Sequence, residues 1–299
     1  MARVQPLVGA LWLSNRLREG LGRIRILDAS WHMPATGRNA SEEFAQRRIP
    51  TAQFFDVDRI ADQKSDLPHM LPSPSEFEEH VAKLGIGNDS HVVVYDNNAS
   101  GLFSAARVWW TFRVFGHDDV SVLDGGLPKW IENGCSVEDG QAKAPIASAT
   151  FRVHEFRSGL VRTFQDIKEN VQSNVEQVAD ARSEGRFDGT APEPRPGLPS
   201  GHISHSRNVH YQSLLDPQTR TLKSSKELLK VFDSAGISLS KPMIATCGSG
   251  ITACLIAFAA FVCNQENVAV YDGAWTEWAL KAGPQQIVTK NEEARTTTI

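Results

Sequence analysis

The chain contains an internal repeat, and this feature restricts its possible folds more than any other. Residues 24–134 can be aligned with residues 177–283, and four blocks of sequence correspond in the same order. The plainest pair is residues 120–130 and 268–278, each of which reads as an apolar strand, a glycine turn and an amphipathic helix. A duplication of this length predicts two similar units in one chain.

Within each half, short apolar strands alternate with helical stretches. We expect helices at residues 75–84, 163–175 and 224–235. This alternation predicts an α/β fold in which each half is a parallel sheet flanked by helices. Residues 135–150 are polar and show little periodicity, as is typical of a linker. We therefore expect a first domain at residues 1–140, a linker at 141–160 and a second domain at 161–299.

Composition excludes several classes of function. The formal net charge is −4 and the basic residues form no stripe, so nucleic acid is not an expected partner. No apolar run approaches the roughly 20 residues that a membrane-spanning helix needs, so we expect a soluble protein without a membrane partner. The cysteines show neither a disulfide framework nor a CxxC zinc pattern, which indicates a reducing compartment: Cys135, Cys247, Cys254 and Cys263.

The N-terminal region is basic and leaves two interpretations open. It contains a single acid, Glu19, among five arginines: Arg3, Arg16, Arg18, Arg23 and Arg25. Such a composition has features of a mitochondrial leader. We favour a surface helix of the first domain, because four leucines are spaced as packing positions: Leu11, Leu13, Leu17 and Leu21. The expected location is cytoplasmic, mitochondrial or both.

The strongest candidate for chemistry is Cys247. It lies between an apolar run at residues 242–246, which predicts a buried strand, and another at 251–263, which predicts a buried helix. Gly248 and Gly250 allow positive φ, so successive backbone N–H groups can turn towards one point and bind an anion. The helix dipole adds to this effect, and the loop should therefore stabilise a thiolate that acts as a nucleophile.

The first half has no nucleophile at the corresponding position. Its strand at residues 92–95 is followed by Asp96, where the second half has Cys247. Ligands of open parallel sheets bind beyond the carboxyl ends of the strands, which is where both residues should lie. We therefore expect catalysis in the second half and a non-catalytic first half.

Over almost its full length the chain resembles the two-domain rhodanese-like sulfurtransferases. The loop from Cys247 to Thr252 is similar to that of the members that use 3-mercaptopyruvate. Members that use thiosulfate have two basic residues after the cysteine, whereas this chain has Gly248 and Ser249. The resemblance implies sulfur transfer from 3-mercaptopyruvate through a persulfide on Cys247, with release of pyruvate. The alternative within the family is a thiosulfate:cyanide sulfurtransferase.

The resemblance also implies partners and substrate-binding residues. Acceptors would be thioredoxin, small thiols or cyanide, with hydrogen sulfide formed when a dithiol reduces the persulfide; no metal or organic cofactor is needed. Arg186 and Arg195 lie in a stretch rich in proline and glycine, which we expect to be an exposed loop. Paired guanidinium groups suit the carboxylate and keto oxygens of a small oxo acid. The remaining contacts to substrate would come from the loop itself: Gly248, Gly250, Ile251 and Thr252.

A proton relay is implied by a further likeness. Residues 55–72 are similar to the family segment that contributes an Asp and a His, and the matching residues here are Asp58 and His69. With Ser249 they would form a relay in which an ordered imidazole draws a proton from the serine hydroxyl. Taken without the resemblance, a histidine in such a segment is more often a surface or capping residue.

Two rival classes are disfavoured by particular residues. A cysteine-dependent phosphatase needs an arginine six positions after its cysteine to bind phosphate, and this chain has Ala253 there. A non-catalytic binding module would not need Cys247 together with Arg186 and Arg195. The other three cysteines are most simply structural residues, although an exposed thiol at Cys135 or Cys263 could respond to oxidants.

Overall fold

The computed structural model describes residues 4–144 and 149–290. Arg3 and residues 145–148 of the expected linker therefore lie outside the described residues. The chain divides into two compact units. Unit 1 comprises Met1–Ser65, Leu71–Arg157 and Leu215–Leu222, and unit 2 comprises Asp66–Met70, Ser158–Leu214 and Lys223–Ile299. Each unit thus includes one short segment from the other half of the sequence.

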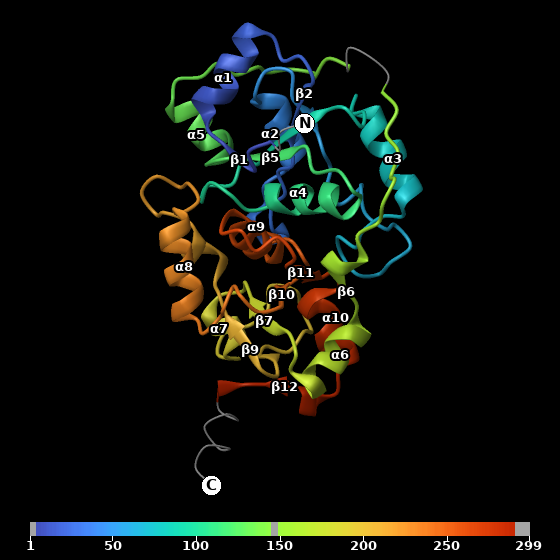
Figure 1. Cartoon of the computed structure of the whole chain (residues 1–299), viewed down its shortest axis with the longest axis vertical. Coiled ribbons are helices and arrows are strands. Elements are labelled where there is room, and N and C mark those ends of the chain that lie inside the picture. The colour runs from blue at the N-terminus through green and yellow to red at the C-terminus, as the bar shows by residue number, and fades with distance from the viewer. Residues whose placement is uncertain (1–3, 145–148, 291–299) are drawn as a thin grey trace. The chain divides into compact units, whose positions relative to one another are not determined.

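Unit 1 contains alternating strands and helices, many of which are labelled in Figure 1. Its helices and strands are, in order, β1 (Leu7–Val8), α1 (Ala10–Glu19), β2 (Ile24–Asp28), the 3₁₀ helix η1 (Pro34–Thr36), α2 (Ala40–Gln46), β3 (Gln53–Phe54), α3 (Pro74–Lys83), β4 (His91–Tyr95), α4 (Ala105–Val114), β5 (Val120–Leu123) and α5 (Gly126–Glu132).

Unit 2 repeats this pattern with additional short elements. Its helices and strands are η2 (Ser158–Leu160), β6 (Val161–Arg162), α6 (Phe164–Ser173), β7 (Gln177–Asp180), α7 (Glu184–Phe187), β8 (His202–Ile203), β9 (Ser206–Asn208), η3 (Tyr211–Leu214), α8 (Ser225–Ser234), β10 (Met243–Thr246), α9 (Ala253–Val262), β11 (Ala269–Tyr271), α10 (Ala274–Lys281), η4 (Pro284–Gln286) and β12 (Ile287–Val288).

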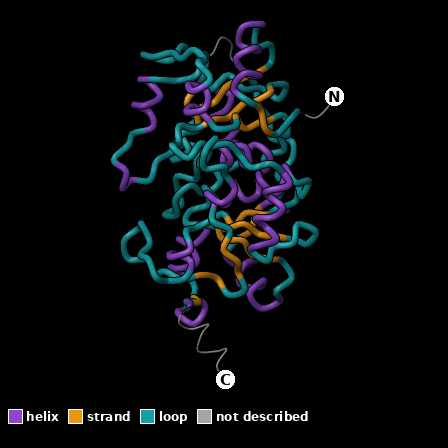
Figure 2. The backbone as a smooth tube through the Cα atoms, turned by 90° about the vertical axis from the view of Figure 1, so that its left-hand side faces the viewer, coloured by secondary structure: helices purple, strands orange, loops and turns teal. Residues whose placement is uncertain are grey.

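The two units have the same sheet topology. The strand order is β1-β5-β4-β2-β3 in unit 1 and β6-β11-β10-β7-β9 in unit 2, and all neighbouring strands in both sheets are parallel. Figure 2 shows the strands gathered in the middle of each unit with helices around them. The expected α/β fold with a parallel sheet in each half is therefore confirmed. A separate antiparallel pair, β8 and β12, belongs to unit 2.

Local sequence explains where several helices begin. Ser73, Thr163 and Ser224 are the N-caps of α3, α6 and α8, and each is part of a reciprocal capping box with an acidic residue three positions later. Such a box satisfies two backbone N–H groups that a helix start otherwise leaves unpaired. These three helices accordingly start within two residues of the sequence expectation.

Helix α1 confirms a helix near the N-terminus but corrects one of its packing positions. Leu13 is buried, and Leu17 and Leu21 pack partly buried against the apolar cluster of unit 1. Leu11 is instead 60% exposed. It lies two positions from Leu13, which places it on a different face of a helix with 3.6 residues per turn. In the described residues no helix is long and apolar enough to span a membrane.

In unit 2, helices cover both faces of the sheet and so position its central strand. On one face, α6 and α10 lie side by side (Figure 1), with Phe164 against Trp278 and Ile167, Ile244 and Tyr271 beneath them. On the other face lies α9, which is buried from Ala253 to Phe261. The central strand β10 is buried throughout, as expected for a parallel sheet with both faces covered.

Candidate functional site

Cys247 lies directly after the central strand of unit 2. Its exposed fraction is 2%, and the loop that follows leads into α9, for which Thr252 is the N-cap. The helix therefore begins two residues later than the sequence indicates. Gly250 has a φ of +79°, while Gly248 is not in the left-handed region. The expected freedom of φ is thus used at Gly250 alone.

The start of α10 fixes the carbonyl groups of this loop. The backbone N–H of Trp275 donates to the carbonyl oxygen of Cys247 at 2.9 Å. The backbone N–H and hydroxyl of Thr276 both donate to the carbonyl oxygen of Gly248, at 3.0 and 2.6 Å. Because these carbonyls are held on one side, the loop N–H groups can point to the other. Over residues 4–144 and 149–290, no protein acceptor binds the backbone N–H of Ser249 or Thr252. This arrangement can bind an anionic sulfur.

Arg186 is positioned beside the loop by the short helix α7. Its Nε and Nη2 donate to the two carboxylate oxygens of Glu193 at 3.1 and 2.6 Å. A Cβ atom built on Gly248 would lie 2.9 Å from Nη2 of Arg186. Glycine at position 248 thus allows the guanidinium to approach the backbone, a role that differs from the expected freedom of φ. Arg186 belongs to a helix, whereas the sequence suggests an exposed loop.

Arg195 and His210 are two further basic residues of unit 2. Arg195 is half-buried in the segment between α7 and β8. His210 is half-buried between β9 and η3, and burial lowers the pKa of its imidazole, with a further lowering by the positive charge of Arg186. His210 is therefore neutral at physiological pH and adds no second cation beside Arg186.

His69 belongs to unit 2 through the segment Asp66–Met70, and it contacts the loop. Its Nδ1 lies 3.2 Å from the backbone carbonyl oxygen of Ser249. A carbonyl only accepts, so Nδ1 of His69 carries a proton and donates it in this hydrogen bond. The φ of His69 is +64°, which costs about 1–2 kcal/mol for a residue with a side chain. Such strain is typical of residues held in place for function.

The other members of the expected relay lie as follows. Ser249 is buried in the loop after Cys247. Asp58 belongs to unit 1, where both of its carboxylate oxygens accept from Nε1 of Trp31, at 3.1 and 3.0 Å. The hydrogen bond between His69 and Ser249 thus uses the serine backbone, and the relay through its hydroxyl stays a prediction.

Sequence reasoning did not identify Arg182 and Glu193 as site residues. Arg182 is buried and paired with Asp180 and Glu193, and Glu193 holds Arg186. One signal was available: Arg182 lies four residues before Arg186, and Glu193 lies seven residues after it. Charged residues near the carboxyl end of a buried strand need partners.

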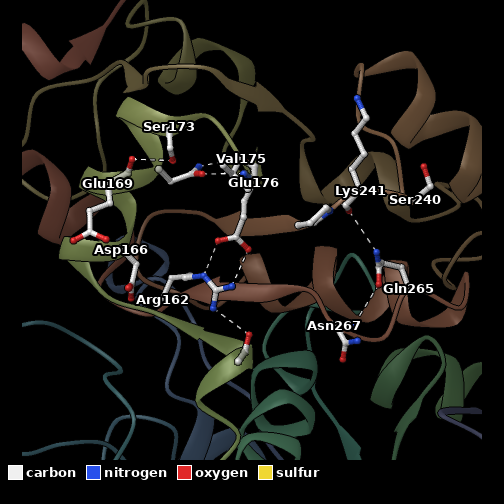
Figure 3. A pocket seen from close by; sticks show the side chains of 13 residues that line it. Arg162, Asp166, Glu169, Ser173, Val175, Glu176, Ser240, Lys241, Gln265 and Asn267 are labelled. Atoms are coloured by element: carbon white, nitrogen blue, oxygen red, sulfur yellow. Dashed lines mark hydrogen bonds and ion pairs between the residues drawn. The ribbon is translucent and has the colours of Figure 1, made fainter.

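A cavity of about 700 Å³ lies at the amino ends of the strands in the sheet of unit 2, away from the carboxyl end where Cys247 lies (Figure 3). Its lining includes Arg162, held by both carboxylate oxygens of Glu176 at 2.8 Å, and Pro242, which precedes β10. The amino ends of parallel strands are not where such sheets bind substrates. No group of three or more His, Cys, Asp or Glu side chains suited to a metal occurs in the described part of the chain.

Comparison with known proteins agrees with this geometry. A family model described as a rhodanese-like domain matches twice, at residues 10–133 and 163–281. The human 3-mercaptopyruvate sulfurtransferase is 43% identical over 288 residues, which cover 96% of each chain. The rat thiosulfate sulfurtransferase is 44% identical, with 97% of each chain covered.

One solved structure is similar to this chain over almost its full length. It is the sub-stoichiometric sulfur transferase subunit of yeast mitochondrial complex I, with a TM-score of 0.85 and 36% sequence identity. The match covers 96% of this chain and all of that subunit.

Proposed function

The chain belongs to the rhodanese-like family and is a sulfurtransferase, and we propose that its sulfur donor is 3-mercaptopyruvate. The observation that supports this choice most strongly is the uncharged loop after Cys247 with the guanidinium of Arg186 held beside Gly248. Mercaptopyruvate carries its charge on a carboxylate some bonds away from the sulfur. A neutral loop with a cation at its side suits this distribution of charge.

The reaction proceeds in two displacements. The Cys247 thiolate attacks the sulfur of mercaptopyruvate, a sulfur–sulfur bond forms, and the carbon–sulfur bond breaks. The bonding electrons leave with the three-carbon fragment as the enolate of pyruvate, which then takes up a proton. A persulfide remains on Cys247, and loop N–H groups stabilise its negative charge. An acceptor thiol removes the outer sulfur in the second displacement.

Proton transfer is assigned to the relay of Asp58, His69 and Ser249. The enolate needs a proton at carbon, and the Ser249 hydroxyl beside Cys247 can supply it directly or through water. His69, ordered by its contact with the Ser249 backbone, would draw the proton of that hydroxyl while the hydroxyl takes up the thiol proton that mercaptopyruvate loses, and would return it when the enolate is protonated. Asp58 would orient and charge-stabilise the imidazole.

Substrate binding is assigned to Arg186 and Arg195, with the loop residues Gly248, Gly250, Ile251 and Thr252. Arg186→Ala and Arg195→Ala should each raise the KM for mercaptopyruvate by roughly ten- to a hundredfold, as expected for loss of a charge-assisted hydrogen bond of about 1.5–3 kcal/mol. Thiosulfate lacks a carboxylate, so its KM should rise less in Arg195→Ala. An equal loss for both donors would contradict this division of roles.

The direct test is a comparison of donors on the purified protein. Steady-state kinetics with 3-mercaptopyruvate and with thiosulfate, both with cyanide as acceptor, should give the higher kcat/KM for mercaptopyruvate. Thiosulfate sulfurtransferase activity is the second candidate, favoured by the rat relative, which is as similar to this chain as the human enzyme is. A higher kcat/KM for thiosulfate would establish that alternative.

The proposed acceptors are thioredoxin and small thiols in the cell, with cyanide as an artificial acceptor. Reduction of the persulfide by a dithiol releases hydrogen sulfide and leaves a disulfide on the reductant. Loading Cys247 with donor and then adding reduced thioredoxin or a small thiol should release sulfide in proportion to enzyme. Location in the cytoplasm, the mitochondrion or both is part of the proposal, and fractionation of cells that produce the natural chain would decide it.

A further inference from the structure

We propose that Glu193 is a positioning residue for sulfur transfer, because it holds Arg186 against the Cys247 loop and is itself held by Arg182. The inference rests on the proposed function, in which Arg186 binds the donor. It adds two residues that act through Arg186 and do not touch the reacting atoms.

Four charged side chains of alternating sign form a continuous chain of ion pairs in unit 2. Asp180 binds Arg182 at 2.6 Å, Arg182 binds Glu193 at 2.9 Å, and Glu193 binds Arg186 at 2.6 Å. The side chains of Asp180, Arg182 and Glu193 are 1%, 0% and 3% exposed, whereas that of Arg186 is 21% exposed. The chain of ion pairs therefore begins in the interior and ends at the one group that solvent or a substrate can reach.

Arg182 is the fixed point of this chain. Its Nη2 also donates to the carbonyl oxygen of Gly201 at 2.7 Å, and its guanidinium lies 4.1 Å from the ring centre of Trp275. Burial alone would lower the pKa of Arg182, but its two carboxylate partners outweigh that effect and the pKa is raised. Trp275 also binds the carbonyl oxygen of Cys247 through its backbone. The same residue thus contacts the anchor of Arg186 and the nucleophile.

Glu193 leaves one edge of Arg186 for a ligand. It occupies Nε and Nη2, and within the described residues no protein acceptor binds Nη1. The edge formed by Nη1 and the outer hydrogen of Nη2 can therefore grip a second carboxylate in a bidentate manner. An arginine without Glu193 would sample many rotamers and would lose that freedom when the donor binds.

The test is Glu193→Gln, which keeps the shape of the side chain but replaces one acceptor oxygen with a donor. The bidentate pair with Arg186 is then lost. We expect the KM for mercaptopyruvate to rise roughly three- to tenfold, because binding would then have to order one flexible side chain. The kcat should change less than twofold, because the loop around Cys247 is held by α10. If this variant does not fold, Glu193→Asp, whose shorter side chain cannot span both nitrogens, takes its place.

Two controls separate positioning from general stability. Glu176 forms a bidentate pair of the same kind with Arg162, at the amino ends of the strands (Figure 3). Glu176→Gln breaks that pair and should leave the kcat and the KM for mercaptopyruvate unchanged. In an Arg186→Ala background, Glu193→Gln should add little to the rise in KM, because its effect passes through the absent arginine.

The outcomes distinguish this inference from the proposed function. If Arg186→Ala leaves the KM for mercaptopyruvate unchanged, the assignment of Arg186 as donor ligand fails, and the inference fails with it. If Arg186→Ala raises the KM while Glu193→Gln does not, the proposed function stands and only the positioning role is wrong. A full additional effect of Glu193→Gln without Arg186 would likewise overturn that role.

Discussion

The loops that follow the central strands of the two units occupy equivalent positions but differ in the residue that follows the strand. In unit 1, Asp96 follows β4, and its Oδ2 accepts from the backbone N–H groups of Phe103, Ser104 and Ala105 at 2.9, 2.9 and 2.8 Å. This carboxylate belongs to the chain and occupies the start of α4 permanently. In unit 2 the corresponding residue is Cys247, and within residues 4–144 and 149–290 no carboxylate accepts from the backbone N–H groups of Ser249 and Thr252.

The comparison shows that equivalent positions of a duplicated fold can hold either a buried carboxylate or a cysteine. Both helix starts need a negative group, because backbone N–H groups and the helix dipole are concentrated there. Unit 1 supplies that group with a side chain, at the cost of burying it, and burial raises the pKa of Asp96 against the opposing effect of its backbone donors. Unit 2 leaves the position for a thiolate or persulfide.

A second pair of equivalent residues shows the same contrast. Asp28 ends β2 and Asp180 ends β7, and the residue two positions later is Ser30 in unit 1 but Arg182 in unit 2. Asp180 is therefore paired with a guanidinium, whereas Asp28 accepts hydrogen bonds from uncharged groups such as the backbone N–H of Ser30, and burial raises its pKa to about 6. The chain of ion pairs that reaches Arg186 can exist only in unit 2.

The largest expected effect comes from replacing the sulfur of Cys247 with oxygen. Cys247→Ser should abolish sulfur transfer with the fold intact, because a hydroxyl forms neither the thiolate nor a persulfide. Intact-mass analysis after donor treatment should show one added sulfur on the parent protein and on Cys263→Ser, a matched control at the end of α9. Sulfur retained by Cys247→Ser would place the nucleophile elsewhere.

The complementary change in unit 1 should affect stability and spare the chemistry. Asp96→Ala leaves three buried N–H groups without their acceptor, so the free energy of unfolding should fall by about 3–5 kcal/mol. Asp96→Asn keeps one acceptor oxygen and should lose less. Denaturant unfolding measures both, and persulfide formation per folded molecule should be unchanged. A loss of persulfide formation in folded Asp96→Asn would show that the loop after β4 takes part in catalysis.

The pH dependence of stability tests the unpaired acid of unit 1. Because the folded-state pKa of Asp28 is raised to about 6, the folded chain binds more protons than the unfolded chain between about pH 4 and 6. The contribution of Asp28 to stability should therefore decrease as pH rises through this window, by on the order of 3 kcal/mol. In Asp28→Asn this part of the pH dependence should disappear.

Asp180→Asn is the matched variant for this test. It leaves Arg182 without one of its buried carboxylate partners, so it should destabilise the protein at neutral pH as well. Denaturant unfolding at several pH values compares the two variants. If Asp28→Asn and Asp180→Asn change the pH profile in the same way, the contrast between paired and unpaired acids is wrong.

The smallest expected effect concerns donor choice and the charge of the loop. A double substitution of Gly248 by Arg and Ser249 by Lys would add two charges, but a side chain at position 248 would also displace Arg186. Ser249→Lys alone adds one charge and leaves that contact intact. We expect the ratio of kcat/KM for thiosulfate to that for mercaptopyruvate to rise about fivefold, as for one charge interacting across a partly solvated site.

Salt dependence sharpens the interpretation of that variant. The gain with thiosulfate should weaken as ionic strength rises, because screening reduces the attraction of a dianion. Ser249→Ala is the control, since it removes the hydroxyl without adding charge. A donor ratio that is the same in Ser249→Lys and Ser249→Ala would attribute the change to the lost hydroxyl.

Local patterns were sufficient to predict several of the longer elements of this fold. The helix expected at residues 224–235 is α8, Ser225–Ser234, because its capping box and apolar spacing are both local. The strand before Cys247 and the helix after it were predictable for the same reason. Leu11 was misjudged because its exposure depends on which face of α1 meets the sheet, and periodicity alone leaves neighbouring faces ambiguous.

The amino-acid sequence by itself determined the duplication, the parallel α/β class and the place of Cys247 at the start of a helix, since each follows from short-range order in the chain. Only the tertiary structure decided how the site is held together. Glu193 meets Arg182 and Arg186 because α7 and the following segment fold back on the end of β7, and Gly248 is needed because that fold brings a guanidinium against its backbone. Such contacts depend on rotamers and on the approach of separate segments, which no local pattern encodes.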